Sequence, residues 1–160
     1  MKYLFILAVL IGSCKASNTS TSKGAPAPTE SQDLLTEESR QIDDSMVKIE
    51  FKNRSGAQLS ILNPMEKRVD LWSADGWTKV NILYCDCGAP PCPAPPTERP
   101  VGVDRNFTFS WDRQIENCLE TDSGRITKKT DAPKGEYRVL YSFKDANEST
   151  NQLEARFTLE

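Results

Sequence analysis

The most reactive side chains of this 160-residue chain are four cysteines in its second half. Three of them lie in the segment Cys85-Asp-Cys87-Gly-Ala-Pro-Pro-Cys92, and Cys118 follows 26 residues later. Thiols can pair as disulfides, bind soft metal ions or take part in redox reactions. In an oxidising compartment, two disulfides that join a proline-stiffened loop to a sheet are the expected outcome.

Four cysteines allow three pairings, and a Cys85–Cys87 bond would close a ring too tight for ordinary disulfide geometry. Of the other two, the sequence favours Cys87 with Cys92 inside the loop and Cys85 with Cys118 between strand ends. The alternative joins Cys85 to Cys92 and Cys87 to Cys118. In the chain-entropy model, the longer closure of the favoured pairing contributes about 3 to 4 kcal/mol and the shorter one about 2 kcal/mol.

A metal site or a redox pair is the other possible use of the same sulfurs. Structural zinc sites usually present two C-x(2–4)-C pairs, whereas here the first spacing is C-x-C and Cys118 stands alone. Copper(I) is compatible with thiolate ligands, but no basic cluster lies nearby in the sequence to activate a thiol. The sequence therefore predicts structural disulfides, no metal and no cofactor.

Prolines are concentrated between Cys85 and Pro100, which predicts a stiff and extended loop. Such a loop can serve as a recognition surface. The candidate partner-binding residues in it are Gly88, Ala89, Pro90, Pro91, Pro93, Pro95 and Pro96. The alternative is a rigid connection between sheets, in which proline removes backbone donors that have no strand partner.

The chain has no histidine, and this excludes many catalytic mechanisms. Neither a Ser-His-Asp nor a Cys-His nucleophile can be built, nor a His-ligated metal site. Several acidic residues are scattered near Trp111 without marking a catalytic pair; they are Asp104, Asp112, Glu116, Glu120 and Asp122. The net charge of -3 and the lack of a basic block argue against nucleic-acid binding. We therefore expect neither catalysis nor a nucleic-acid partner.

The N-terminus predicts export. Lys2 precedes an apolar run over residues 3–11, which is too short to span a bilayer and is typical of a signal peptide at residues 1–13. The sequence Ile11-Gly-Ser-Cys14 resembles the lipobox of bacterial lipoproteins, in which the cysteine is lipidated and becomes the mature N-terminus. An ordinary signal peptide cut near Ala16 is the alternative.

The lipobox resemblance implies that a lipid on Cys14 anchors the protein to a membrane. Lipidation of Cys14 leaves four cysteines, an even number, for pairing in an oxidising compartment. Lys15 stands where an acidic residue would favour the inner membrane, so the resemblance implies the outer membrane, on its periplasmic or surface face.

Residues 14–45 are expected to be a flexible linker that carries the lipidated cysteine. The segment is rich in Ser, Thr, Pro and acidic residues, and its only larger apolar residues are Leu34, Leu35 and Ile42. This is too little apolar surface to offset the conformational entropy of ordering the chain. A short amphipathic helix over residues 34–42 that docks on the domain is the alternative.

Residues 46–160 show alternating apolar and polar residues in short runs between turn signals, which predicts β-strands. The expected strands are 46–52, 58–62, 69–72, 77–84, 106–111, 136–143 and 153–159. Trp111 is expected in the core. Trp72 and Trp77 flank the turn at Asp75-Gly76 and are expected to pair across strands, with a carbohydrate-stacking platform as the alternative.

Seven short strands predict an all-β domain, an antiparallel immunoglobulin-like sandwich, with a small barrel as the alternative. The segment Pro133-Lys-Gly-Glu-Tyr137, with its strand and a last strand ending in Phe157-Thr-Leu159, resembles the closing hairpin of bacterial immunoglobulin-like domains. The wider pattern resembles uncharacterised secreted lipoprotein domains. This resemblance implies a fold and a location but no activity.

These features predict a lipid-anchored cell-envelope binding or structural module without catalytic activity. Its partner would be an envelope protein or polymer. The alternative is a protease inhibitor, or an accessory subunit of a secretion or envelope complex, that acts through the Cys85–Pro100 loop. A histidine-free enzyme or a thiol or metal protein is the third hypothesis.

Overall fold

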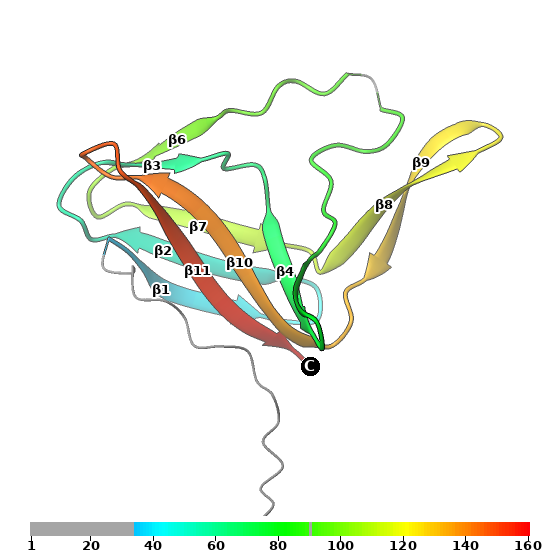
Figure 1. Ribbon diagram of the computed structural model, residues 1–160, viewed down its shortest axis with the longest axis horizontal. Coiled ribbons are helices and arrows are strands. Elements are labelled where there is room, and N and C mark those ends of the chain that lie inside the picture. The colour runs from blue at the N-terminus through cyan, green and yellow to red at the C-terminus, as the bar shows by residue number, and fades with distance from the viewer. Residues whose placement is uncertain (1–33, 90) are drawn as a thin grey trace, which may run out of the picture.

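The computed structural model describes residues 34–89 and 91–160, and all regular elements in these ranges are β-strands (Figure 1). The predicted all-β class is therefore confirmed. The strands are β1 (Leu35–Ile42), β2 (Val47–Asn53), β3 (Leu59–Leu62), β4 (Arg68–Ser73), β5 (Gly76–Lys79), β6 (Glu98–Val101), β7 (Asn106–Trp111), β8 (Gln114–Thr121), β9 (Gly124–Asp131), β10 (Gly135–Lys144) and β11 (Thr150–Leu159).

The strands form antiparallel sheets of three, six and two strands. The three-stranded sheet has the order β1-β2-β7. In the six-stranded sheet β10 pairs with β11 on one side and with β4 and β3 in succession on the other, while β5 extends β4 and β6 extends β3. The remaining pair, β8 and β9, forms a separate hairpin.

The core lies between the two larger sheets, where alternating apolar residues face one another. Along β2, Val47, Ile49 and Phe51 are buried, as the alternation predicts. Trp111 on β7 is 1% exposed, which confirms its expected core position, and its ring centroid lies 5.5 Å from that of Tyr137 on β10. Such aromatic contacts between the sheets bury large apolar areas and stabilise their packing.

A buried asparagine fixes the turn after β2. The Asn53 side-chain amide donates to the carbonyl oxygens of Ala57, Val101 and Gly102, and its Oδ1 accepts from the Ser55 N–H. Asn53 is fully buried, so these bonds satisfy a polar group that would otherwise be costly. They join the turn at residues 53–56 to the connection between β6 and β7.

The expectation of a flexible linker up to residue 45 is wrong for residues 35–42, and so is the alternative of a helix there. This segment is β1, which pairs with β2 from Leu35↔Asn53 to Ile42↔Val47. Leu35 is buried at the start, but the remaining residues of β1 are mostly exposed at a sheet edge and include a bulge between Glu37 and Ser39. An exposed edge strand needs little apolar alternation, so this segment carries no strand pattern in the sequence. Residues 14–33 lie outside the described residues.

The expected strand at 77–84 is also wrong beyond Lys79, where β5 ends. The next residue, Val80, is buried and bonds to Val69, and the chain then leaves the sheet. The predicted pairing of Trp72 with Trp77 is confirmed, since the two are in register and their rings lie 5.1 Å apart. Strands β6, β8 and β9 were not expected, because most of their residues are exposed.

Candidate functional site

The candidate site is an appendage that we call the hairpin–loop unit, consisting of residues 81–97 and 114–131. Its β8–β9 hairpin projects away from the two larger sheets, and the 81–97 connection runs beside it (Figure 1). Pro90 lies outside the described residues. All the described residues from Gly88 to Thr97 are exposed, as are most of those in β8 and β9.

Both disulfides lie in this unit. Cys85 is bonded to Cys92, with the Cα atoms 6.4 Å apart, and Cys87 is bonded to Cys118, with the Cα atoms 5.6 Å apart. The expected disulfide framework is present, but the favoured pairing is wrong and the alternative pairing is observed. All four sulfurs are therefore in disulfides, which are not the thiolates that a zinc or copper(I) site needs.

The register of the β8–β9 hairpin explains why the observed disulfide pairing differs from the favoured one. Cys118 on β8 lies opposite Thr127 on β9, and the Thr127 hydroxyl accepts a hydrogen bond of 2.7 Å from the Cys87 N–H. This bond holds Cys87 beside Cys118. Cys85 does not follow a strand end, because β5 ends six residues earlier at Lys79.

Asn81 and Glu116 connect the loop to the hairpin at its base. The Glu116 N–H donates to the Asn81 carbonyl oxygen at 2.9 Å, and the Asn81 side-chain amide donates to the Glu116 carbonyl oxygen at 2.6 Å. The Glu116 carboxylate also accepts from the Leu83 N–H at 2.8 Å. Glu116 is thus a positioning residue, although the sequence placed it among scattered surface acids.

The charge of Glu116 is retained although the residue is 7% exposed. Burial acts to raise its pKa, but the Lys129 ammonium at 2.7 Å and the Leu83 N–H outweigh burial, so the pKa lies below its ordinary value. Glu116 in turn raises the pKa of Lys129. The ionised pair joins β8, β9 and the loop.

Two further contacts fix the unit at its outer part and at its base. Gly88 has a positive φ of 75° and lies against the backbone of Arg125 on β9. At the base, Arg113 has a φ of 59° and donates from Nη1 to the Asp43 carbonyl oxygen at 2.6 Å. The Ala132 N–H donates a hydrogen bond to the Arg113 carbonyl oxygen, which joins the two strand ends at the base of the unit.

The unit exposes apolar side chains beside its polar ones. Leu119 on β8 and Ile126 on β9 face one another in register and are 41% and 48% exposed. They lie on the side of the hairpin opposite to Cys118 and Thr127, because side chains alternate along a strand. Neither residue was predicted from the sequence. The signal that could have found them is the Asp-Ser-Gly turn at 122–124 between two runs of similar length.

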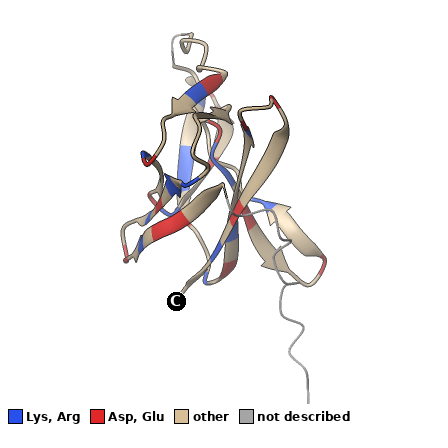
Figure 2. Cartoon of the chain, turned by 90° about the vertical axis from the view of Figure 1, so that its left-hand side faces the viewer, with Lys and Arg blue, Asp and Glu red and all other residues tan. Residues whose placement is uncertain are grey.

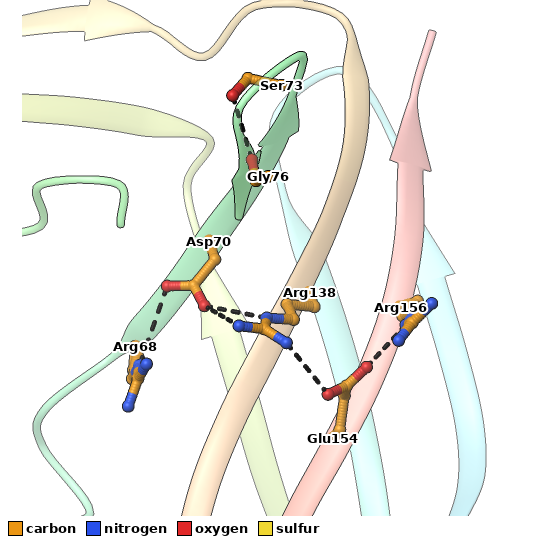
Figure 3. A network of polar contacts seen from close by, with 7 residues as sticks. All are labelled: Arg68, Asp70, Ser73, Gly76, Arg138, Glu154 and Arg156. Carbon is orange, nitrogen blue, oxygen red and sulfur yellow. Dashed lines mark hydrogen bonds and ion pairs between the residues drawn. The ribbon is translucent and has the colours of Figure 1, made fainter. Parts of the chain in front are cut away.

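A second polar cluster lies on the outer face of the six-stranded sheet (Figure 3). Asp70 on β4, 2% exposed, pairs with Arg138 on β10, which also contacts Glu154 on β11. The Arg138 guanidinium lies 4.5 Å from the centroid of the Trp77 ring, and that of Arg156 lies 5.3 Å from it. The guanidinium groups of Arg138 and Arg156 therefore lie over the Trp77 ring, on which a carbohydrate would have to stack. The polar cluster stabilises the six-stranded sheet through these cross-strand contacts.

Cationic and anionic segments are interspersed over the strands (Figure 2). Among residues 34–89 and 91–160, no group of three or more His, Cys, Asp or Glu residues is arranged to hold a metal ion. A membrane-spanning helix is absent from the part of the chain that the structure describes. Cys14, the expected lipidation site, precedes that part.

No protein family model, no curated protein and no solved structure matches this chain. Function must therefore be argued from the geometry of the hairpin–loop unit.

Proposed function

We propose that this protein is a lipid-anchored, non-catalytic binding module of the cell envelope, and that it contacts an envelope protein or polymer through the hairpin–loop unit. The observation that carries the proposal is the position of the two disulfides. Both lie in an exposed appendage outside the core, which is formed by other residues.

Rigidity in an exposed appendage is useful for recognition. A loop that is already ordered loses less conformational entropy when a partner binds, so more of the contact energy contributes to affinity. Here the loop is held by Cys87–Cys118, by the bond from Cys87 to Thr127 and by the contacts of Glu116. Binding residues are often carried on loops that a rigid scaffold positions.

The position of the unit relative to the N-terminal tether also supports the proposal. β1 begins at Leu35, which pairs with Asn53, whereas the hairpin follows Trp111, which pairs with Val47 at the other end of β2 (Figure 1). The two ends are separated by the length of β7, about 20 Å. A lipid attached to Cys14 would therefore leave the unit facing away from the point where the tether enters the domain.

The scaffold itself is proposed to be an immunoglobulin-like sandwich. The orders β1-β2-β7 and β11-β10-β4 correspond to strands A-B-E and G-F-C of that fold, with the β8–β9 hairpin inserted between E and F. Near the start of β10, the Tyr137 hydroxyl donates to the Pro133 carbonyl oxygen at 2.5 Å. This contact corresponds to the tyrosine corner of immunoglobulin-like domains.

The anchor is tested by the intact mass of the protein extracted from native membranes, with and without reduction and alkylation. We expect a chain that begins at Cys14, carries acyl groups and takes up four alkyl groups only after reduction. A lipid-free chain that begins after Cys14 would refute the anchor.

The binding surface is tested by replacing Leu119 or Pro93 with a photocrosslinking amino acid in cells of the native host. Thr108, an exposed residue of β7, is the matched control position. We expect the same discrete crosslinked product from both unit positions and none from the control, with the product suppressed by excess purified domain. Equal crosslinking from all three positions, or none from the unit, would contradict the proposal.

A protease inhibitor or accessory subunit is the second candidate function, favoured by the loop closed by Cys85 and Cys92. Loop residues 88, 89 and 91–97 are all exposed, and the disulfide closes the part of the loop between Cys85 and Cys92. Inhibition requires an intact loop in the substrate groove of a protease.

We would measure residual activity of serine, cysteine and metalloproteases with the intact protein and with a variant lacking residues 88–96. Inhibition lost on deletion would favour this candidate, and cleavage without inhibition would exclude it for the proteases tested.

A further inference from the structure

The two edges of the β8–β9 hairpin differ in what covers them. In an antiparallel pair, successive residues direct their backbone groups alternately toward the partner strand and away from it. The Glu116 N–H points outward, because it donates to Asn81, and Glu116 lies opposite Lys129. Thr127, Lys129 and Asp131 on β9 therefore also direct their backbone groups outward.

The outward edge of β8 is covered at Glu116 by Asn81 and is joined to the loop by Cys118. The edge of β9 pairs with no other strand in the described ranges. A Cβ on Gly88 would meet this edge at Arg125, and the backbone groups of Thr127, Lys129 and Asp131 form no backbone hydrogen bond to another described segment. A segment of about five residues can form hydrogen bonds there.

The side chains along this edge set the chemistry of its partner. β9 carries Arg125, Lys128 and Lys129 against the single acid Asp131. Arg125 and Lys129 pair with acids of β8, and Lys128 has no ion-pair partner among the described residues. Lys128 lies on the same side of the hairpin as the exposed Ile126.

We propose that the free edge of β9, from Thr127 to Asp131, binds an extended acidic segment of the partner protein as a third strand. This inference rests on the proposed function and names the partner chemistry of the same unit. Backbone hydrogen bonds would supply affinity, and Lys128 and Ile126 would select an acidic and an apolar side chain two residues apart. Isolated two-stranded hairpins gain stability from a third strand.

Pairing with the same edge of a second copy is disfavoured by charge. Two β9 strands side by side would bring Lys128 and Lys129 of both copies together, and like charges across strands are destabilising. Lysines on an edge strand are a common device against self-association. The same charges attract an acidic strand.

The probe is the capped peptide Thr-Glu-Glu-Thr-Val, which in the antiparallel register places Glu opposite Lys128 and Val opposite Ile126. It is titrated to millimolar concentration into the full disulfide-bonded domain and followed by amide NMR. We expect chemical-shift changes confined to β9 and its neighbours, and slower hydrogen exchange at the Thr127 and Lys129 amides. A peptide with Lys in place of Glu and a peptide N-methylated at alternate residues should not bind.

Protein variants separate strand addition from general charge attraction. Lys128→Glu should weaken peptide binding about fivefold or more, as expected from reversal of one exposed charge. Lys134→Glu, an exposed change of the same kind outside the unit, is the matched control and should leave the affinity unchanged. Ile126→Ser should also weaken binding.

The outcomes distinguish this inference from the proposed function. Equal binding of the N-methylated peptide, equal effects of Lys128→Glu and Lys134→Glu, or no binding of the probe would overturn strand addition. Self-association through β9, detected as a concentration-dependent mass, would also overturn it. If crosslinks from Leu119 and Pro93 persist while these tests fail, the unit binds its partner in another way and the proposed function stands.

Discussion

Gly88 lies against the β9 edge so closely that a Cβ on this residue would overlap the carbonyl oxygen of Arg125. Its φ of 75° is also one that other residues rarely adopt. The neighbouring Cys87 forms a disulfide with Cys118 and donates its N–H to Thr127, and these two bonds hold the loop on the hairpin. Gly88 is thus required by the packing of the hairpin–loop unit.

We therefore expect Gly88→Ala to lower the free energy of unfolding by about 1–3 kcal/mol, measured by urea denaturation. Gly56→Ala is the matched control, because Gly56 has nearly the same φ of 74° but nothing within 4 Å of an added Cβ. The control should lose less stability, since it suffers only the backbone strain. Equal losses in the two variants would show that the contact with Arg125 is unimportant.

The two disulfides should contribute unequally to stability. Cys87 and Cys118 are 31 residues apart and Cys85 and Cys92 are 7 apart. The chain-entropy model gives about 4 kcal/mol for the longer closure and about 2 kcal/mol for the shorter. Denaturation of the double variants Cys87→Ser/Cys118→Ser and Cys85→Ser/Cys92→Ser should show the larger loss in the first. The opposite order would contradict this assignment of their roles.

Acidification should weaken the junction of loop and hairpin through Glu116. Its pKa is lower in the folded protein, so its ionised form stabilises the fold above the ordinary glutamate pKa of about 4.3, and this contribution is lost as the pH falls through the lowered value. Glu116→Gln removes the titrating group. Denaturation between pH 7 and pH 3 should show a steeper loss for the native protein than for the variant.

Other acidic groups with lowered pKa values also respond to acid, so the comparison needs a control. Asp145→Asn removes a carboxylate whose pKa is lowered by the backbone N–H groups of Asn147 and Ser149, in the turn between β10 and β11. Exchange of the Leu83 amide, corrected for its intrinsic pH dependence, reports the junction itself. Its acid response should disappear in Glu116→Gln and persist in Asp145→Asn.

The sequence predicted those strands whose residues alternate between core and solvent, such as β2, β7, β10 and β11. It did not predict β1, β8 and β9, because nearly all their residues are exposed and show little apolar alternation, although each strand pairs with a neighbour along the chain. The disulfide pairing depends on the β8–β9 hairpin. Cys87 reaches Cys118 because Thr127 lies opposite Cys118 in a hairpin that the sequence did not reveal.

The cysteine- and proline-rich loop could be recognised from composition, but its attachment could not. Glu116 resembled the other scattered acids in sequence, and only the fold brings it to Asn81, Leu83 and Lys129. The exposed pair Leu119 and Ile126 could not be recognised from composition either, because neither residue stands out until the register of the β8–β9 hairpin places them opposite each other.

The turn after β2 offers a test of the scaffold that is independent of the hairpin–loop unit. Asn53 has no exposed surface and donates to three backbone carbonyls, of which Val101 and Gly102 lie 48 and 49 residues away. Asn53→Ala would leave these buried acceptors without their donor. We expect a loss of about 2–4 kcal/mol in the free energy of unfolding.

Asn106→Ala, at an exposed position on neighbouring β7, is the control and should change the free energy of unfolding by at most about 0.5 kcal/mol. Because Asn53 joins the two larger sheets at the end where β1 begins, its loss should destabilise the whole domain and leave the disulfide pairing unchanged. Denaturant midpoints and disulfide mapping of the two variants measure both effects. An Asn53→Ala variant as stable as Asn106→Ala would mean that water replaces the side-chain amide, and that the junction is held by the surrounding strands alone.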